Sequence, residues 1–89
     1  MSLNANWELR VRERVYKDIA SFPREARERI TAVIESLSDN PYAGDIEKMK
    51  GEERAWRRRI GNYRVRYEII PGQKIVYVFR VERRATNTY

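Results

Sequence analysis

The sequence predicts an α+β fold class: one small domain of order β-α-α-β-β-β, with an antiparallel sheet and two helices packed on one face. A chain of 89 residues can bury only one compact core, so residues 1–89 are expected to form a single domain. Apolar and polar residues alternate near the start of the chain and again after residue 55, as in half-buried strands. Between these stretches apolar residues recur at helical spacing, and two helices on one sheet face bury both apolar stripes.

The first half of the chain is expected to form one strand and two helices. Residues 7–11 alternate between apolar and charged, which indicates a short strand. From residue 13 the apolar spacing becomes helical, and a proline-containing segment at 21–23 separates a short helix from a longer one. The longer helix keeps one apolar face to about Ser38, and Asn40 with Pro41 ends the helical region.

The second half is expected to form an antiparallel meander of three strands. Residues 42–53 carry glycines and charges with little periodicity, so they are interpreted as a loop, with short strand content around Lys48 as the alternative. Aromatic and β-branched residues then concentrate in the segments 56–60, 63–70 and 75–83. Turn-forming pairs separate these strands, namely Gly61 with Asn62 and Pro71 with Gly72.

The composition favours a polyanionic partner and excludes several kinds of chemistry. The chain has 19 Lys and Arg against 13 Asp and Glu, a net charge of +6 and a pI near 10.0. Nucleic acid is therefore the first expectation and an acidic protein the second. The absence of cysteine and histidine excludes disulfides, thiolate metal sites and imidazole chemistry. Without a membrane-length apolar run or a signal peptide in residues 1–6, we expect a cytoplasmic protein that does not bind membranes.

The densest positive charge lies in the strands expected at 56–60 and 63–70. A two-residue turn between them pairs Arg59 with Arg64 and Arg57 with Arg66, so four arginines share the face opposite the helices. Like charges directly opposite each other destabilise a sheet unless an anion or neighbouring acids neutralise them. Because guanidinium groups bind phosphate through paired hydrogen bonds, the pattern predicts a nucleic-acid interface.

The alternative interpretation of these arginines is a solvated outer face whose counter-charges are Glu52, Glu53 and Glu68. Alternation places Arg58 on the core side of the sheet, where it is expected to reach solvent at the sheet edge or to pair with a helix acid. Trp56 shares that side and is interpreted as a core residue.

Several short motifs follow one another in an order similar to that of a known family. In chain order they are Asn40-Pro41, Gly44-Asp45, Lys48-Met49-Lys50-Gly51, Trp56-Arg57-Arg58-Arg59-Ile60-Gly61 and Tyr63-Arg64-Val65-Arg66-Tyr67. Together they resemble the RelE/ParE toxin superfamily, in element order over 7–84 and most closely over 40–68. The resemblance implies a toxin whose partner is a cognate antitoxin protein. RelE-like members cut mRNA in the ribosomal A site, whereas ParE-like members poison DNA gyrase.

The resemblance to RelE-like toxins also implies catalytic residues. Arg57 and Arg59 correspond to two cationic catalytic residues on one strand, and Arg64 to the arginine of the next strand. Arg84 corresponds to an arginine that closes the last strand, and Tyr89 to a tyrosine that stacks on the substrate base. In this scheme fixed positive charge stabilises the dianionic transition state, and Arg84 or Tyr89 assists the leaving 5′-oxygen.

The general base is expected to lie outside the arginine strands. The implied reaction is attack of a ribose 2′-hydroxyl on the adjacent phosphate, which leaves a 2′,3′-cyclic phosphate and a 5′-hydroxyl without a metal or cofactor. RelE-like toxins have lysines where this chain has Arg57 and Arg59, and arginine hardly deprotonates. The YoeB branch uses a glutamate and a lysine that correspond to Glu47 and Lys50. Glu47, Lys50 or a tyrosine is therefore the candidate base, and Glu47 is the most ready near neutral pH.

Further residues are expected to bind RNA around this set: Lys48, Arg66 and Arg83. Lys48 and Lys50 fit either a solvated loop or a phosphate clamp. Tyr89 fits either a frayed terminus or a place beside the basic face.

Three functions remain open from the sequence. The leading one is a ribosome-dependent endoribonuclease toxin, with the ribosome and mRNA as partners besides the antitoxin. The others are a ParE-like inhibitor of DNA gyrase and a catalytically silent binding module with the RelE fold.

Overall fold

The computed structural model describes residues 7–84 as a five-stranded sheet and two helices. In chain order the elements are β1 (Glu8–Val11), α1 (Glu13–Ala20), α2 (Arg24–Ser36), β2 (Ile46–Lys48), β3 (Ala55–Ile60), β4 (Tyr63–Ile70), the 3₁₀ turn η1 (Pro71–Gln73) and β5 (Ile75–Arg83). The strands lie side by side in the order β1-β5-β4-β3-β2. Neighbouring strands are antiparallel, except that β1 runs parallel to β5.

The predicted α+β class and order of elements are confirmed, with two differences in the sheet. β2 is a further strand in the segment that the sequence predicted mainly as a loop, and its three residues are too few to show alternation. The parallel pairing of β1 with β5 was not predicted, because the two strands are far apart in the chain and no turn sets their direction. α2 ends two residues before Ser38, since the amides of Leu37 and Ser38 donate to carbonyls three residues earlier and not four.

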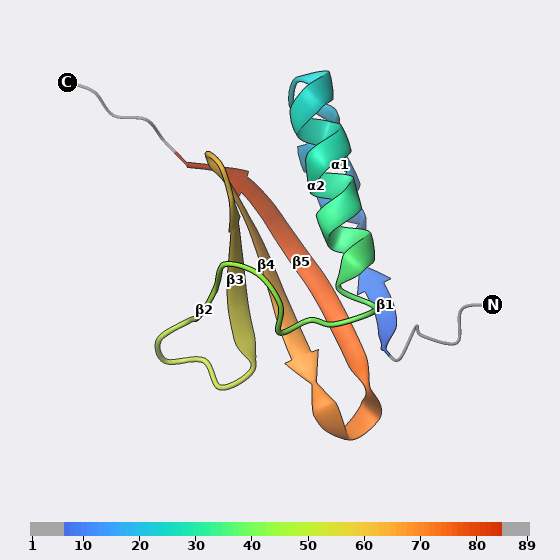
Figure 1. Ribbon diagram of the computed structural model, residues 1–89, viewed down its shortest axis with the longest axis vertical. Helices are drawn as coiled ribbons and strands as arrows, with labels where there is room; N and C mark the ends of the chain where they lie inside the picture. The colour runs from blue at the N-terminus through green and yellow to red at the C-terminus, as the bar shows by residue number, and fades with distance from the viewer. Residues whose placement is uncertain (1–6, 85–89) are drawn as a thin grey trace.

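The core lies between the helices and one face of the sheet. In Figure 1 α1 and α2 lie together beside β5 and β1. Val15 of α1 and Ile30 of α2 are fully buried there, as are Val65 of β4 and Val78 of β5. Fully burying an aliphatic side chain of this size contributes roughly 1.5–3 kcal/mol, so this layer is the main source of stability. Within residues 7–84, neither helix is long and apolar enough to cross a membrane.

The segment between α2 and β2 is tied to the same face of the sheet at Tyr67. This side chain is fully buried, and its hydroxyl donates a hydrogen bond of 2.9 Å to the carbonyl of Pro41. Burial raises the pKa of Tyr67 to about 12, so the phenol stays protonated near neutral pH. The hydrogen bond therefore fixes the segment over the middle of β4.

The hairpin of β3 and β4 has the register that the sequence predicts. It closes on a two-residue turn in which Gly61 takes φ +58°, a left-handed conformation that glycine adopts without strain. Arg59 consequently lies opposite Arg64, and Arg57 lies opposite Arg66.

A bulge in β5 changes which of its side chains face outward. Arg66 of β4 pairs with Arg80, but the next pair skips Phe79, so β5 has one extra residue there. Beyond the bulge Val81, 2% exposed, faces the core. Arg80 and Glu82 alternate with it and therefore lie on the face opposite the helices, beside the arginines of the hairpin.

We expect Tyr67→Phe to lower the free energy of unfolding by about 1–2 kcal/mol, because it leaves the Pro41 carbonyl without its partner. Urea denaturation at pH 7 measures this loss, with Tyr16→Phe, at a side chain 62% exposed, as the neutral control. Because the pKa of Tyr67 is raised from 10.0 to about 12, this contribution is complete below pH 10 and is lost as the pH rises through 12. Equal stability of the two variants would contradict the assignment.

Candidate functional site

Five arginines of β3, β4 and β5 share the sheet face that the helices leave open, and we call this surface the arginine face. They are Arg57 and Arg59 of β3, Arg64 and Arg66 of β4, and Arg80 of β5. Neighbouring strands lie about 4.8 Å apart, so arginines in register repel one another unless anions lie between them. The counter-charges of this face therefore decide what it can bind.

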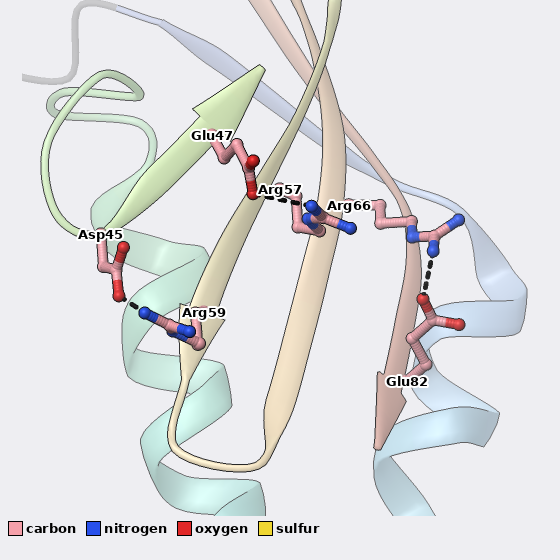
Figure 2. Close-up of polar contacts among 6 residues, drawn as sticks. All are labelled: Asp45, Glu47, Arg57, Arg59, Arg66 and Glu82. Carbon is pink, nitrogen blue, oxygen red and sulfur yellow. Dashed lines mark hydrogen bonds and ion pairs between the residues drawn. The ribbon is translucent and has the colours of Figure 1, made fainter. Parts of the chain in front are cut away.

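Two carboxylates neutralise the β3 side of the arginine face (Figure 2). Glu47 pairs with Arg57 in the β2-β3 register, and Arg57 Nη2 donates to Glu47 Oε1 at 2.7 Å. Arg59 Nε donates to Asp45 Oδ2 at 3.1 Å, and its main-chain amide donates to the Asp45 carbonyl at 3.0 Å. Both acid side chains are more than 60% exposed, so each ion pair contributes at most about 1 kcal/mol. A phosphate that offers stronger, charge-assisted hydrogen bonds can replace them.

A third carboxylate neutralises the β5 side. Glu82 Oε2 lies 2.7 Å from Arg66 Nη2, and its Oε1 lies 3.3 Å from Arg80 Nε. One negative charge thus serves two guanidinium groups, and Figure 2 shows the shorter of these contacts beside the pair of Arg57 and Glu47.

Arg64 differs from the other arginines of this face. It lies opposite Arg59 on one side and Glu82 on the other, yet none of the ion pairs within residues 7–84 includes it.

Arg64 also lines a small cleft of about 80 Å³ whose other walls are Asp45, Glu47, Arg57 and Arg59. Liquid water takes about 30 Å³ per molecule and ligand pockets usually span hundreds of Å³, so this cleft suits a phosphate group and not a whole nucleotide. Three arginines against two carboxylates give it a positive balance.

Glu47 is held in its ionised form. The hydrogen bond from Arg57 lowers the pKa of Glu47 most, and the charges of Arg57, Arg64 and Arg59 lower it further. The carboxylate is therefore ready to accept a proton near neutral pH, although its low pKa makes it a weak base while Arg57 is bound to it.

Arg58 lies on the opposite side of β3 and supports the site from beneath. It was expected to reach solvent at the sheet edge or to pair with a helix acid; its side chain is partly exposed, and within residues 7–84 it forms no ion pair. Its Nη1 donates to the Ala43 carbonyl at 3.2 Å, and its guanidinium lies against Gly44, where a Cβ would overlap Arg58 Cζ. Gly44 has φ +91°, a conformation that other residues rarely adopt, and a side chain there would displace the Arg58 guanidinium. Arg58 thereby fixes the residue before Asp45.

The cleft unites four of the residues predicted from the sequence: Glu47, Arg57, Arg59 and Arg64. Arg66 lies one strand away from Arg57. Trp56, predicted as a core residue, packs against the core cluster.

Other predicted residues lie elsewhere. Alternation in β2 puts Lys48 on the opposite face from Glu47, and Lys50 lies beyond the end of β2 in the loop that follows it. Arg83 lies over the ring of Tyr63, 6.0 Å from its centroid, on the core side. Arg84 is held at the hairpin turn by its amide, which donates to the Asn62 carbonyl. Tyr89 lies outside the described residues.

Sequence reasoning missed three members of this site: Asp45, Arg80 and Glu82. It named other acids as counter-charges, and none of those forms an ion pair within residues 7–84. The spacing of Asp45 two residues before Glu47 was a usable signal, because alternate residues of an extended chain share a side. No pattern marks the bulge that turns Arg80 and Glu82 outward. Over the same described range, no group of three acidic side chains is placed to hold a metal ion.

Comparison with known proteins gives consistent matches. A family model described as "ParE toxin of type II toxin-antitoxin system, parDE" matches residues 9–88. The protein "Toxin RelE3" of Methanocaldococcus jannaschii is 35% identical over 77 residues, which cover 82% of this chain and 86% of that protein. A chain of the archaeal RelE-RelB complex from Pyrococcus horikoshii OT3 has a TM-score of 0.78 at 22% identity, covering 92% of this chain and 99% of that one. A chain of the RelB-RelE antitoxin-toxin complex from Methanococcus jannaschii has a TM-score of 0.71 at 27% identity, covering 83% and 88%.

We expect Arg57→Gln to raise the pKa of Glu47 toward the ordinary carboxylate value of 4.5, because it removes the hydrogen bond that lowers this pKa most. Arg59→Gln is the matched control, since Arg59 has the smallest of the lowering effects. NMR titration of the Glu47 carboxyl carbon measures both. Equal titration of Glu47 in the two variants would show that Arg57 is not its main partner.

We expect Gly44→Ala to destabilise the fold more than Gly51→Ala. Both glycines have positive φ, so both substitutions strain the backbone by about 1–3 kcal/mol. Only at Gly44 does the added methyl also meet the Arg58 guanidinium, because Gly51 has nothing within 4 Å. Thermal and urea unfolding compare the two variants, and an equal loss of stability would argue against the contact with Arg58.

Proposed function

The chain belongs to the RelE/ParE superfamily of toxins from type II toxin-antitoxin systems, and we propose that it is a RelE-like toxin that cleaves mRNA on the ribosome. The observation that carries this proposal is the phosphate-sized cleft in which Arg64 has no acidic partner within residues 7–84 while Glu47 stands beside it as an ionised carboxylate. RNA cleavage by an internal nucleophile requires two groups. One is a positive charge without an anion of its own, and the other is a proton acceptor.

In the proposed reaction the ribose 2′-oxygen attacks the adjacent phosphorus, and Glu47 accepts the 2′-hydroxyl proton. The new bond closes a 2′,3′-cyclic phosphate, and the bond to the 5′-oxygen breaks. Arg57, Arg59 and Arg64 stabilise the extra negative charge on the phosphate oxygens. The leaving 5′-oxygen takes a proton from the phenol of Tyr89, or from water while the guanidinium of Arg84 compensates its negative charge.

Phosphate binding makes Glu47 a better base in this mechanism. Arg57 holds the Glu47 carboxylate in the free protein. When Arg57 turns to the phosphate, this hydrogen bond weakens and the pKa of Glu47 rises toward its ordinary value. A tyrosine base is less suitable at the hairpin, because Tyr67 faces the core and burial raises its pKa to about 12. Lys50 does not line the cleft.

The proposed partners are the ribosome with its mRNA and a cognate antitoxin. Related chains occur in RelE-RelB complexes from Pyrococcus horikoshii and Methanococcus jannaschii. A short protein that neutralises the arginine face would suppress cleavage, because the face uses the same charges to bind phosphate.

Inhibition of DNA gyrase is the second candidate function, because the family model that matches this chain is that of ParE toxins. In that case the arginine face contacts a protein target and Glu47 is only a counter-charge of Arg57. A catalytically silent binding module is the remaining alternative, since this chain has arginines at 57 and 59 where RelE-like toxins have lysines.

We expect the purified protein to cut mRNA in the A site of programmed ribosomes. Arg64→Ala should lower the cleavage rate by about 10²–10³-fold through the loss of transition-state stabilisation. Glu47→Gln should lower it by about 10²–10⁴-fold through the loss of the base. Arg24→Ala is the control: it removes an arginine of α2, on the helix side, whose side chain is 82% exposed and paired with Glu28, and it should cut at the wild-type rate.

The outcomes separate the candidate functions. Unchanged cutting by Arg64→Ala would refute the assignment of the cleft. Absence of cutting together with blocked supercoiling by gyrase would establish the second candidate. Absence of both activities would leave the binding module.

A further inference from the structure

The outer side of β5 carries a charged and aromatic surface that the proposed reaction does not use. The bulge at Phe79 brings Arg80 beside Arg66. Phe79 precedes Arg80 at the bulge, and Tyr77 lies opposite Glu68, two residues along β4 from Arg66; the two ring centroids are 6.3 Å apart. Neither ring belongs to the hydrophobic core or packs against it, and both are partly exposed. We call Arg66, Arg80, Tyr77 and Phe79 the β5 patch.

The two arginines of the β5 patch share one ion-paired carboxylate, and Glu68, which lies opposite Tyr77 on the same face, pairs with neither of them. Glu82 bridges Arg66 and Arg80 and is the only carboxylate within residues 7–84 that pairs with either of them. Arg10 of β1 lies opposite Tyr77 at the far side of the patch, but it pairs with Glu8. The Arg80 side chain is 39% exposed, so it can turn from Glu82 to an incoming anion.

The β5 patch also continues the cleft around Arg64. Arg57 of the cleft lies opposite Arg66, and Arg66 lies opposite Arg80, so the three form one row across β3, β4 and β5. Neighbouring strands are about 4.8 Å apart, so each arginine of this row lies within a side chain's reach of the next arginine. An extended polyanion bound in the cleft therefore meets the patch as it continues across the sheet.

We propose that the β5 patch is a second RNA subsite, in which Arg66 and Arg80 bind a phosphate that neighbours the cleaved one and Tyr77 with Phe79 stacks on a base. Glu82 holds the two arginines in the absence of RNA. The choice of RNA rests on the proposed function, whereas the subsite itself rests on the bulge, the shared carboxylate and the exposed rings.

Single-stranded nucleic acid fits the patch better than an acidic peptide. An acidic peptide would satisfy the guanidinium groups and leave the two aromatic rings unused. Single-stranded RNA presents a phosphate and a flat base in every nucleotide, and proteins bind it with basic and aromatic side chains placed side by side.

The test is binding of a short fluorescent single-stranded RNA without ribosomes, followed by anisotropy over a range of salt concentrations. Arg80→Gln should weaken binding and reduce the slope of log affinity against log salt by about 0.7, which corresponds to one phosphate contact. Tyr77→Ala should lower affinity about tenfold and leave the slope unchanged, because stacking releases no counterions. Arg24→Gln on α2 is the matched control for an ion-paired surface arginine and should bind like the wild type.

Glu82→Gln tests the subsite in the opposite direction. Loss of the shared carboxylate should raise RNA affinity about fivefold and steepen the salt dependence, because both arginines become available to phosphate. Damage to the fold cannot produce such a gain. Unchanged or weaker RNA binding by Glu82→Gln, or wild-type binding by Arg80→Gln, would overturn the proposal.

Failure of the subsite and failure of the proposed function give different results. If the wild type does not cut mRNA on ribosomes but Arg80→Gln still weakens RNA binding, the cleavage proposal falls and the subsite stands. If the wild type cuts and all the patch variants bind RNA equally well, only the subsite falls. Binding of acidic peptides without binding of RNA would also refute it.

Discussion

Two pairs of arginines face each other across the β3-β4 hairpin, because its two-residue turn leaves no other register. The repulsion between them is relieved by carboxylates from outside the hairpin, with Asp45 and Glu47 on one side and Glu82 on the other. β2 and the end of β5 are therefore held to the hairpin by charge as well as by main-chain hydrogen bonds. Since the pairs on the β2 side are exposed, they position their arginines without closing them to a stronger anion.

The three consecutive arginines of β3 divide the support of the site between the two faces of the sheet. Arg57 and Arg59 point outward and hold Glu47 and Asp45. Arg58 points inward and holds the backbone at Ala43. The segment that carries Asp45 and Glu47 is consequently bound to both faces of β3. These contacts position the wall of the cleft that is formed by a loop and the very short strand β2.

The parts of this structure that depend on local chemistry were predictable from the sequence. The Gly61 turn set the register of the arginines, and alternation separated Arg57 from Arg58. The partners of these residues were harder to predict, because they depend on pairings between distant segments. The bulge that exposes Arg80 follows from how β5 meets β4, and the contact of Arg58 with Ala43 follows from the path of a loop without periodicity. Tyr89, inferred from resemblance alone, lies beyond the described residues.

The parallel pairing of β1 with β5 has a consequence for how the chain folds during its synthesis. β1 and α1 are made first, yet β5 is the strand that both of them pack against. Until β5 is made, the apolar side chains of β1 and α1 that pack against it stay exposed. The β3-β4 hairpin needs only neighbouring residues and can form earlier. A nascent chain can thus present the arginines of its hairpin before the layer of helices, β1 and β5 that supports them is complete.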